Sequence, residues 1–389
     1  MRKSFLFCFF IVLLSIIFVL RAEVLEGFKV DVPLRVYDKD KFVSGLTRND
    51  LVVYENSQEV KVESLCLIKK AEIKRSEGVM EIPPFTSRNF ILIFQATEYT
   101  SKIADNIEFV FNQILLPGDR LILVTPEKPY NFSQQTLEKY TKDQLIDAIK
   151  KTLKRDISML GASYESIVKA MRNIIRILPD ELGDKENIKQ YLIQYKQLLG
   201  DFNTICKINE PYLLELSDAL KQMKGQSHIF LFYQQEFRPI PDYKTINDLS
   251  RIQDYKLDDL ADLDVFELNK RIESINVKRM QEVFADVAVT FHFIYIKNPQ
   301  GRLPRLIWKE HSVDMFNTFS ELASETGGIV ETTSKPDVAF RHAAATAENY
   351  YLITYGSPNQ TRNGSFRNIE IKLKDKAYKV IHRIGYFAK

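Results

Sequence analysis

The stretch Asn89-Phe90-Ile91-Leu92-Ile93-Phe94 decides the fold class of this chain. It is a continuous apolar run, which is typical of a strand buried on both faces of a parallel sheet. Residues 100–115 then place apolar side chains on one helical stripe, and Pro117-Gly118 ends that helix before a second apolar run at 120–124. A strand, a helix and a strand in succession predict a βαβ unit.

The same alternation continues along the chain. Further buried strands are predicted at His228–Tyr233 and Val287–Ile296, and helices at 143–156, 163–178 and 312–325. We therefore expect an α/β domain over residues 87–345, with a doubly wound, mostly parallel sheet that carries helices on both faces.

Two segments exceed what these units need. Residues 180–225 and 243–284 carry apolar side chains at helical spacing, and the second contains the acidic run Asp258-Asp259. Such spacing favours packing against the core over a ligand site. We expect these helical insertions to form a cap or lid.

Both ends of the chain show strand patterns. Residues 23–70 contain alternating runs such as Lys29–Tyr37, and residues 346–389 contain others such as Phe366–Lys374. Neither end has enough strands for a stable sheet by itself. We expect the two ends to form one small β-sandwich into which the α/β domain is inserted. The charged, proline-containing residues 68–86 predict a linker.

The N-terminus has the pattern of an export signal. Met1-Arg2-Lys3 is positively charged, Ser4–Leu20 is almost wholly apolar, and Arg21-Ala22 ends the run. We predict a cleaved signal peptide over residues 1–22. An uncleaved membrane anchor is the alternative, because Leu20 occupies a position where cleavage favours a small residue. The protein is expected in the periplasm or outside the cell, with membrane contact only through this segment.

Charge and composition exclude several classes of function. Three of the 54 basic residues flank the apolar N-terminal run, and the others equal the 51 acidic residues in number. A neutral body gives no electrostatic reason to expect a nucleic-acid partner. The five histidines are scattered, and no HExxH, GxSxG, GxxxxGK[ST] or GxGxxG motif occurs. The sequence therefore favours a binding protein over an enzyme.

The two cysteines beyond the signal segment are Cys66 and Cys206. Two cysteines cannot form a disulfide framework or a metal cluster. We predict two separate buried thiols, and a disulfide between them in an oxidising compartment is the alternative.

Several short segments occur together in a fixed order. They are Val43–Asn56, Leu116–Leu121 with its PGDR sequence, Leu322–Gly328, Tyr350–Leu352, Gly364–Ile369 and Arg383–Phe387. In these segments the chain resembles the exported bacterial proteins with a von Willebrand factor type A-like domain, the VWFA-related group. The resemblance runs over most of residues 28–388, outside the helical insertions.

The resemblance implies a metal-ion-dependent adhesion site, in which carboxylates and hydroxyls from three loops hold Mg²⁺. At the corresponding positions Gln95 and Gln234 replace the two carboxylates, and Tyr99 replaces a serine. Thr97 keeps one hydroxyl, and Ser163 is expected in the second loop. A neutral amide is a poor substitute for an anionic ligand, so we expect neither Mg²⁺ nor another cofactor. Rescue of the site by Glu98 or Glu236 is the alternative.

The same positions still predict a crevice, because crevices in open α/β sheets form beyond the carboxyl ends of the strands. We expect a rim suited to metal-free recognition of a polypeptide. Its predicted residues are Gln95, Thr97, Glu98, Tyr99, Ser163, Gln234 and Gln235. Two alternatives remain, namely a structural envelope component without a crevice ligand, and a hydrolase that uses the helical cap as a lid.

Overall fold

The computed structural model describes most of the chain beyond the N-terminal segment. The described residues are 28–39, 41–78, 86–208, 210–251, 266, 277–287, 289–374 and 378–388. The predicted signal peptide at residues 1–22 and most of the predicted insertion at 243–284 lie outside them. Within the described part, no helix has both the length and the apolar character that crossing a membrane requires.

The chain is a mixed α/β protein whose largest sheet is mostly parallel. Its strands follow the order β14-β12-β10-β7-β8-β9, and only the edge strand β9 runs antiparallel to its neighbour. The central strands are almost wholly buried, which explains their uninterrupted apolar sequences. The strands are β7 (Arg88–Gln95), β8 (Arg120–Val124), β9 (Pro129–Phe132), β10 (Gln226–Gln234), β12 (Val289–Ile296) and β14 (Val330–Thr333).

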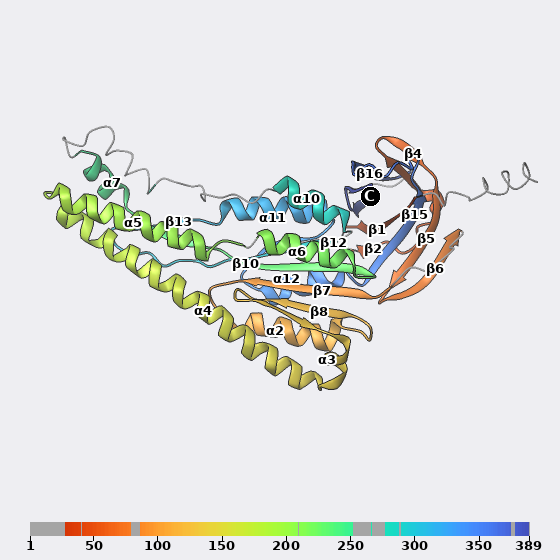
Figure 1. Ribbon diagram of the computed structural model, residues 1–389, viewed down its shortest axis with the longest axis horizontal. Coiled ribbons are helices and arrows are strands. Elements are labelled where there is room, and N and C mark those ends of the chain that lie inside the picture. Colours follow the sequence, from red (N-terminus) through yellow and green to blue (C-terminus); the bar gives the residue numbers. More distant parts are fainter. Residues whose placement is uncertain are drawn as a thin grey trace, which may run out of the picture.

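Helices cover both faces of this sheet (Figure 1). Alternate residues of β7 point to opposite faces, so Phe90 and Leu92 belong to one apolar cluster and Ile91 and Ile93 to the other. The first cluster lies under three helices, namely α2 (Ser101–Phe109), the start of α4 (Lys142–Ile177) and α12 (Pro336–Ala345). Helix α2 continues as a π-helical turn (Val110–Ile114), which contacts the same cluster. The second cluster lies under α6 (Glu210–Lys221), α10 (Val277–Asp286) and α11 (Val313–Glu325).

Helix α4 corrects one prediction. We expected two helices at 143–156 and 163–178, separated by a loop at Gly161, but the structure has one helix of 36 residues. Gly161 lies inside it against the loop after β7, where an added Cβ would stand 2.1 Å from the carbonyl oxygen of Thr97. The glycine therefore permits a close approach between helix and loop and does not break the helix.

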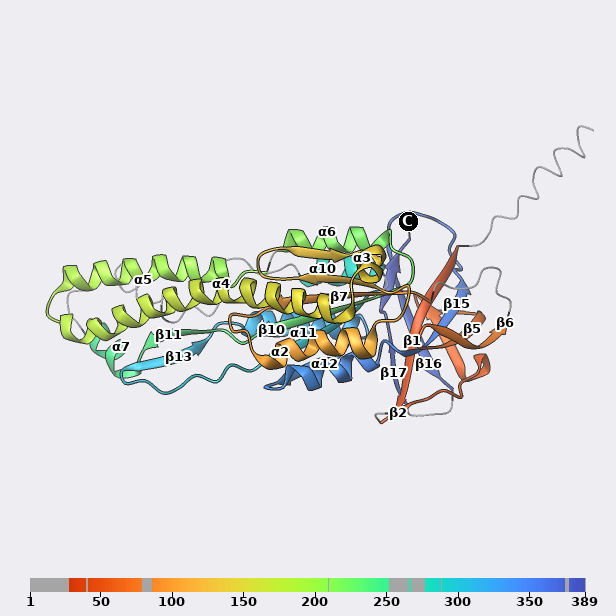
Figure 2. The ribbon, with the colours of Figure 1, turned by 90° about the horizontal axis from the view of Figure 1, so that it is seen from below.

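The distal half of α4 and its neighbours form an arm that extends away from the sheet (Figure 2). Helix α5 (Lys185–Ile205) packs along α4 through a cluster that includes Met171 and Tyr195. The arm also contains the antiparallel pair β11 (Phe237–Pro241) and β13 (Leu306–Glu310) and the short helix α7 (Tyr243–Ser250). The predicted insertion at 180–225 is thus divided, with α5 in the arm and α6 on the sheet face.

The two ends of the chain pair with each other in a unit that we call the terminal β unit. Strand β1 (Lys29–Asp38) lies between β15 (Asn349–Gly356) and β17 (Lys379–His382), and β5 (Val62–Lys69) pairs with the other side of β15. A second sheet contains β18 (Gly385–Phe387), β16 (Phe366–Leu373), β3 (Leu51–Glu55) and β4 (Gln58–Val60). Both sheets are antiparallel and share one apolar cluster.

The predicted linker at 68–86 is wrong over its first part. Strand β6 (Glu72–Gly78) pairs with β5 at the edge of the first sheet, and residues 79–85 lie outside the described part. The strand is exposed and charged, as edge strands commonly are, and so it lacks an apolar pattern. Cys66 is buried in this unit and Cys206 in the arm, and no disulfide joins them, as predicted.

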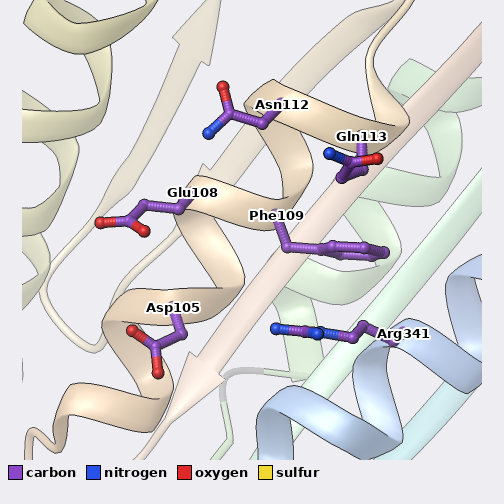
Figure 3. A pocket seen from close by; sticks show the side chains of 6 residues that line it. All are labelled: Asp105, Glu108, Phe109, Asn112, Gln113 and Arg341. Carbon is purple, nitrogen blue, oxygen red and sulfur yellow. The ribbon is translucent and has the colours of Figure 1, made fainter.

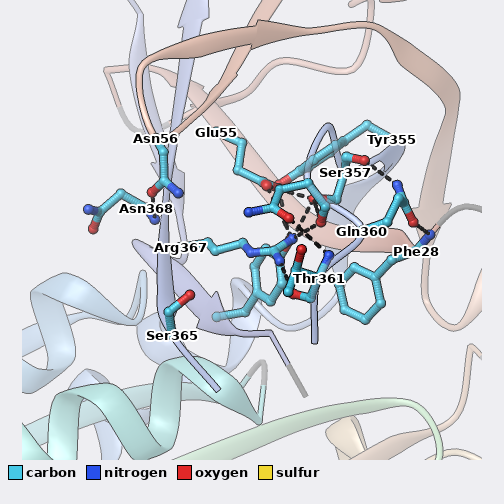
Figure 4. A network of polar contacts seen from close by, with 12 residues as sticks. Phe28, Glu55, Asn56, Tyr355, Ser357, Gln360, Thr361, Ser365, Arg367 and Asn368 are labelled. Atoms are coloured by element: carbon cyan, nitrogen blue, oxygen red, sulfur yellow. Dashed lines mark hydrogen bonds and ion pairs between the residues drawn. The ribbon is translucent and has the colours of Figure 1, made fainter. Parts of the chain in front are cut away.

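A buried polar network joins the N- and C-terminal strands (Figure 4). Glu55 and Arg367 are each 1% exposed, with 3.6 Å between Oε1 of Glu55 and Nη1 of Arg367. Ser357 Oγ donates to Glu55 Oε1 at 2.6 Å, and the hydroxyls of Tyr355 and Tyr386 donate to Oε2 at 2.9 and 2.8 Å. Burial and the neighbouring Glu55 raise the pKa of Tyr355, so this hydroxyl remains a donor.

We expect Arg367→Met to lower the free energy of unfolding by about 3–5 kcal/mol, because Glu55 would keep a buried charge without its cationic partner. The double variant Glu55→Gln/Arg367→Met should recover a large part of this loss. Urea unfolding of the full chain measures both. Equal losses in the single and double variants would contradict the assignment of the cost to the unpaired carboxylate.

Candidate functional site

Gln234 joins the carboxyl ends of two neighbouring strands. Its side-chain oxygen Oε1 accepts hydrogen bonds from the Thr97 N–H at 2.8 Å, the Glu98 N–H at 3.0 Å and the Thr97 hydroxyl at 3.3 Å. Thr97 and Glu98 belong to the loop after β7, whereas Gln234 ends β10, and the side chain is only 6% exposed. One neutral amide therefore fixes the loop where the resemblance implies a metal-binding carboxylate.

Six of the seven predicted rim residues lie on two neighbouring strand ends. Gln95 pairs with Tyr233 at the end of β7, and Gln95 and Thr97 are half-buried while Glu98 is exposed. Tyr99 packs against the apolar cluster below α2, and burial raises its pKa. The Oε1 atom of Gln235 accepts from the Asn298 N–H at 3.3 Å, which links the rim to the end of β12.

Ser163 is the exception and corrects the prediction of a second loop. It lies within α4, its side chain is exposed, and its hydroxyl donates to the carbonyl oxygen of Met159 at 3.4 Å. The hydroxyl is thus used within the helix. The α4 residue that approaches the loop is Gly161, and the glycine itself was the sequence signal for this close contact.

The acidic side chains near the rim differ in their surroundings. Glu98 is exposed, whereas Glu236 is buried and accepts a hydrogen bond from the Tyr233 hydroxyl at 2.7 Å. In the part of the chain that the structure describes, no three His, Cys, Asp or Glu side chains gather as a metal-binding group. At Gln234 two backbone N–H groups point toward the amide oxygen, an arrangement that favours a lone-pair acceptor over a cation.

A hydroxyl and carboxylate cluster, which the sequence did not predict, lies beyond β12. The Tyr295 hydroxyl is 2.6 Å from Glu310 Oε1 and 2.6 Å from Ser312 Oγ, and the Glu236 N–H donates to Ser312 Oγ. Burial, and then the hydrogen bond to Glu310, raise the pKa of Tyr295. Ser312 is fully buried, and the bond from Tyr295 to Glu310 joins β12 of the sheet to β13 of the arm.

A cavity of 140 Å³ opens beside the rim, between the ends of β7 and β8 and the start of α6. Gln95, Thr125 and Lys128 are among its polar lining residues, and Val124 and Leu213 among its apolar ones. Thr125 Oγ1 donates to Asp156 Oδ2 at 2.7 Å. Burial alone would raise the pKa of Asp156, but hydrogen bonds from Thr125 and other donors lower it overall, which keeps the carboxylate charged.

A second hollow, of 430 Å³, lies along the outer side of α2 (Figure 3). Arg341 of α12 places its guanidinium 5.2 Å from the centre of the Phe109 ring, and Asp105 and Glu108 lie on the neighbouring turns. Glu108 forms an ion pair with Lys150 of α4. None of the predicted rim residues lines this hollow.

The core histidines lie toward the opposite, amino end of the sheet. His292 Nδ1 accepts from the Ile329 N–H at 3.2 Å, whereas its Nε2 has no hydrogen-bond partner among the described residues. For His228, neither ring nitrogen has a hydrogen-bond partner among the described residues. Burial holds the pKa of His228 well below its ordinary range, and the ring stacks on Phe90 as a neutral group.

We expect Gln234→Met to release the loop after β7, because the thioether has nearly the same length but is a poor acceptor. The amides of Thr97 and Glu98 should then exchange their hydrogens about tenfold faster or more. The matched variant Gln234→Glu keeps an acceptor at the same place and should retain protection. Hydrogen exchange resolved at these two amides measures both, and unchanged exchange in Gln234→Met would contradict the role of the side chain.

The chain shows little similarity to known proteins in sequence or in structure. No family model matches the chain, and no curated protein matches it. Among solved structures, the human COPII-coat protein Sec24c is similar with a TM-score of 0.32 and 9% sequence identity. The superposition covers 79% of this chain and 43% of that chain, so this chain spans less than half the length of the protein that it matches.

Proposed function

We propose that this chain is an exported protein-binding module on a von Willebrand factor A-like, doubly wound scaffold, and that its rim binds a polypeptide without a metal ion. The observation that carries the proposal is the Gln234 amide, which holds the loop after β7 through three hydrogen bonds. We place the module in the periplasm or outside the cell, with membrane attachment only if residues 1–22 remain uncleaved.

The arrangement of the large sheet supports the scaffold. Its five parallel strands carry helices on both faces, and the rim lies beyond the carboxyl ends of β7 and β10, where open α/β sheets bind their ligands. The amino ends of the same strands face the terminal β unit, since Arg35 of β1 donates to Thr290 Oγ1 at the start of β12. At the opposite, carboxyl edge Glu98 is exposed and Gln95 and Thr97 are half-buried, so these rim residues can be reached from solvent.

The chemistry of the rim supports a polypeptide ligand. Amides and hydroxyls predominate, and they can pair with the N–H and C=O groups of another chain without charge. The adjoining cavity of 140 Å³ combines polar lining residues with apolar ones such as Val124 and Leu213, and a cavity of about 150 Å³ accommodates a benzene-sized group. One aromatic or branched side chain of a partner would fill it and act as an anchor.

Site-specific photo-crosslinking tests the partner. With p-benzoylphenylalanine in place of Glu98, we expect a discrete crosslinked protein in the host cell, and none from the same group at the exposed position Lys61 in the terminal β unit. The crosslinked protein, once purified, should bind the natural chain equally with and without excess EDTA. No adduct at position 98, or equal adducts at both positions, would refute the proposal.

Calorimetric titration tests the metal. We expect no binding heat when Mg²⁺ or Mn²⁺ is added to residues 23–389, because neutral amides do not offset the dehydration of a divalent ion. The variant Gln95→Asp/Tyr99→Ser/Gln234→Asp, which restores the implied ligands, is the comparison and should bind more tightly. Binding to the natural protein at micromolar affinity would contradict the proposal, and Glu98 and Glu236 would then be the first residues to substitute.

A further inference from the structure

A hollow of 480 Å³ lies on the arm, and its lining is strongly basic. Lys169, Arg172 and Arg176 of α4 line one side, and Arg305, just before β13, lines the other. The three helix residues are spaced three and four positions apart, so they form one stripe along the helix. None of the predicted rim residues lines this hollow.

Nearby carboxylates compensate only part of this charge. Arg172 lies 4.0 Å from Glu165 and Arg305 lies 3.4 Å from Asp180, in ion pairs that are largely exposed. Lys169 and Arg176 have no ion-pair partner among the described residues. Among the described residues, two positive charges of the hollow thus lack a counter-ion. Like charges on one helix face repel each other, and a bound anion would relieve that repulsion.

Apolar groups and a fixed loop complete the hollow. Leu303 is 41% exposed, which is high for a large aliphatic side chain, and Leu306 lies beside it in the lining. The Arg172 guanidinium lies 5.9 Å from the ring of Trp308, so its position is restricted. Arg305 adopts a left-handed backbone with φ of 61°, and its carbonyl oxygen accepts from the Asp242 N–H at 3.2 Å.

We propose that this hollow binds an acidic segment of a protein partner, with carboxylates facing the basic stripe and one aliphatic side chain against Leu303. Lys169 and Arg176 lie seven positions apart on the helix, a rise of about 10 Å, which is longer than one phosphate group spans. Charges spread in this way match carboxylates placed along an extended chain, and arginine pairs with carboxylates through two parallel hydrogen bonds. The proposal concerns a second surface and does not depend on the rim.

Fluorescence anisotropy with the full chain tests this proposal. The probe is a labelled peptide of alternating Glu, Asp and Leu residues, and the matched probe carries Gln and Asn instead. We expect saturable binding of the acidic peptide only, which weakens as salt is added. Lys169→Glu/Arg176→Glu should weaken binding about tenfold or more, because two attractions become repulsions.

The control variant is Lys151→Glu/Lys154→Glu, which makes the same change of charge on exposed residues of the same helix outside the hollow. It should change the affinity less than about twofold, since exposed charges beyond the Debye length are screened. Circular dichroism of both variants establishes that α4 remains folded. Equal weakening by both variants would overturn the proposal in favour of non-specific charge attraction.

Three further outcomes would also overturn it. In the first, the neutral peptide binds as tightly as the acidic one. In the second, inorganic phosphate displaces the acidic peptide when the phosphate carries the same total charge as the peptide. In the third, the chain self-associates in a salt-sensitive way that Lys169→Glu/Arg176→Glu abolishes. These outcomes indicate an apolar groove, a small-anion site and a contact between two copies, respectively. Crosslinking from position 98 should persist in Lys169→Glu/Arg176→Glu, which keeps failure of this proposal distinct from failure of the proposed rim.

Discussion

The ion pair between Glu55 and Arg367 is the interaction on which the rest of the structure depends. It joins a strand near the start of the chain to one near the end. Both charged groups are buried, and they are compensated by each other, by nearby hydroxyls and, for Arg367, by the carbonyl oxygens of Asn359 and Thr361. All of the large sheet lies in the chain between these residues. Closing the terminal β unit therefore brings together the entry and the exit of the α/β unit, and Arg35 then bonds to Thr290 and Thr346 on the sheet side.

The sequence predicted those elements whose burial is uniform. Strands β7, β8, β10 and β12 are enclosed on both faces, so their sequences had to be apolar throughout and could be located to within a few residues. Strand β6 is an edge with charged side chains and has no such pattern. The continuity of α4 was hidden because Gly161 is a helix breaker by propensity, and its reason for being there is a contact with Thr97, distant in sequence.

At the candidate site, too, features set by the local sequence could be predicted, whereas contacts between residues distant in sequence could not. The absence of carboxylates at Gln95 and Gln234 can be read directly from the chain, as can the position of the rim beyond two buried strands. The hydrogen bonds from Thr97 and Glu98 to Gln234 could not be foreseen, because the partners are more than 130 positions apart and depend on the register of β7 and β10. The burial of Ser312 and the helical setting of Ser163 likewise follow from tertiary packing.

A neutral Gln234 has a consequence for how the proposed rim would bind. A metal ion at such a rim supplies a strong, directional bond to a carboxylate of the ligand, whereas amides and hydroxyls supply several weaker bonds that compete with water. Affinity at a metal-free rim must then come from apolar burial in the adjoining cavity and from attraction elsewhere. For a partner that also carries an acidic segment, the basic stripe proposed on α4 would supply such attraction, since surface charge mainly accelerates association while a buried anchor slows dissociation. The cavity would then contribute the anchor and the basic stripe the attraction, whereas in a metal-dependent site a single ion binds the ligand.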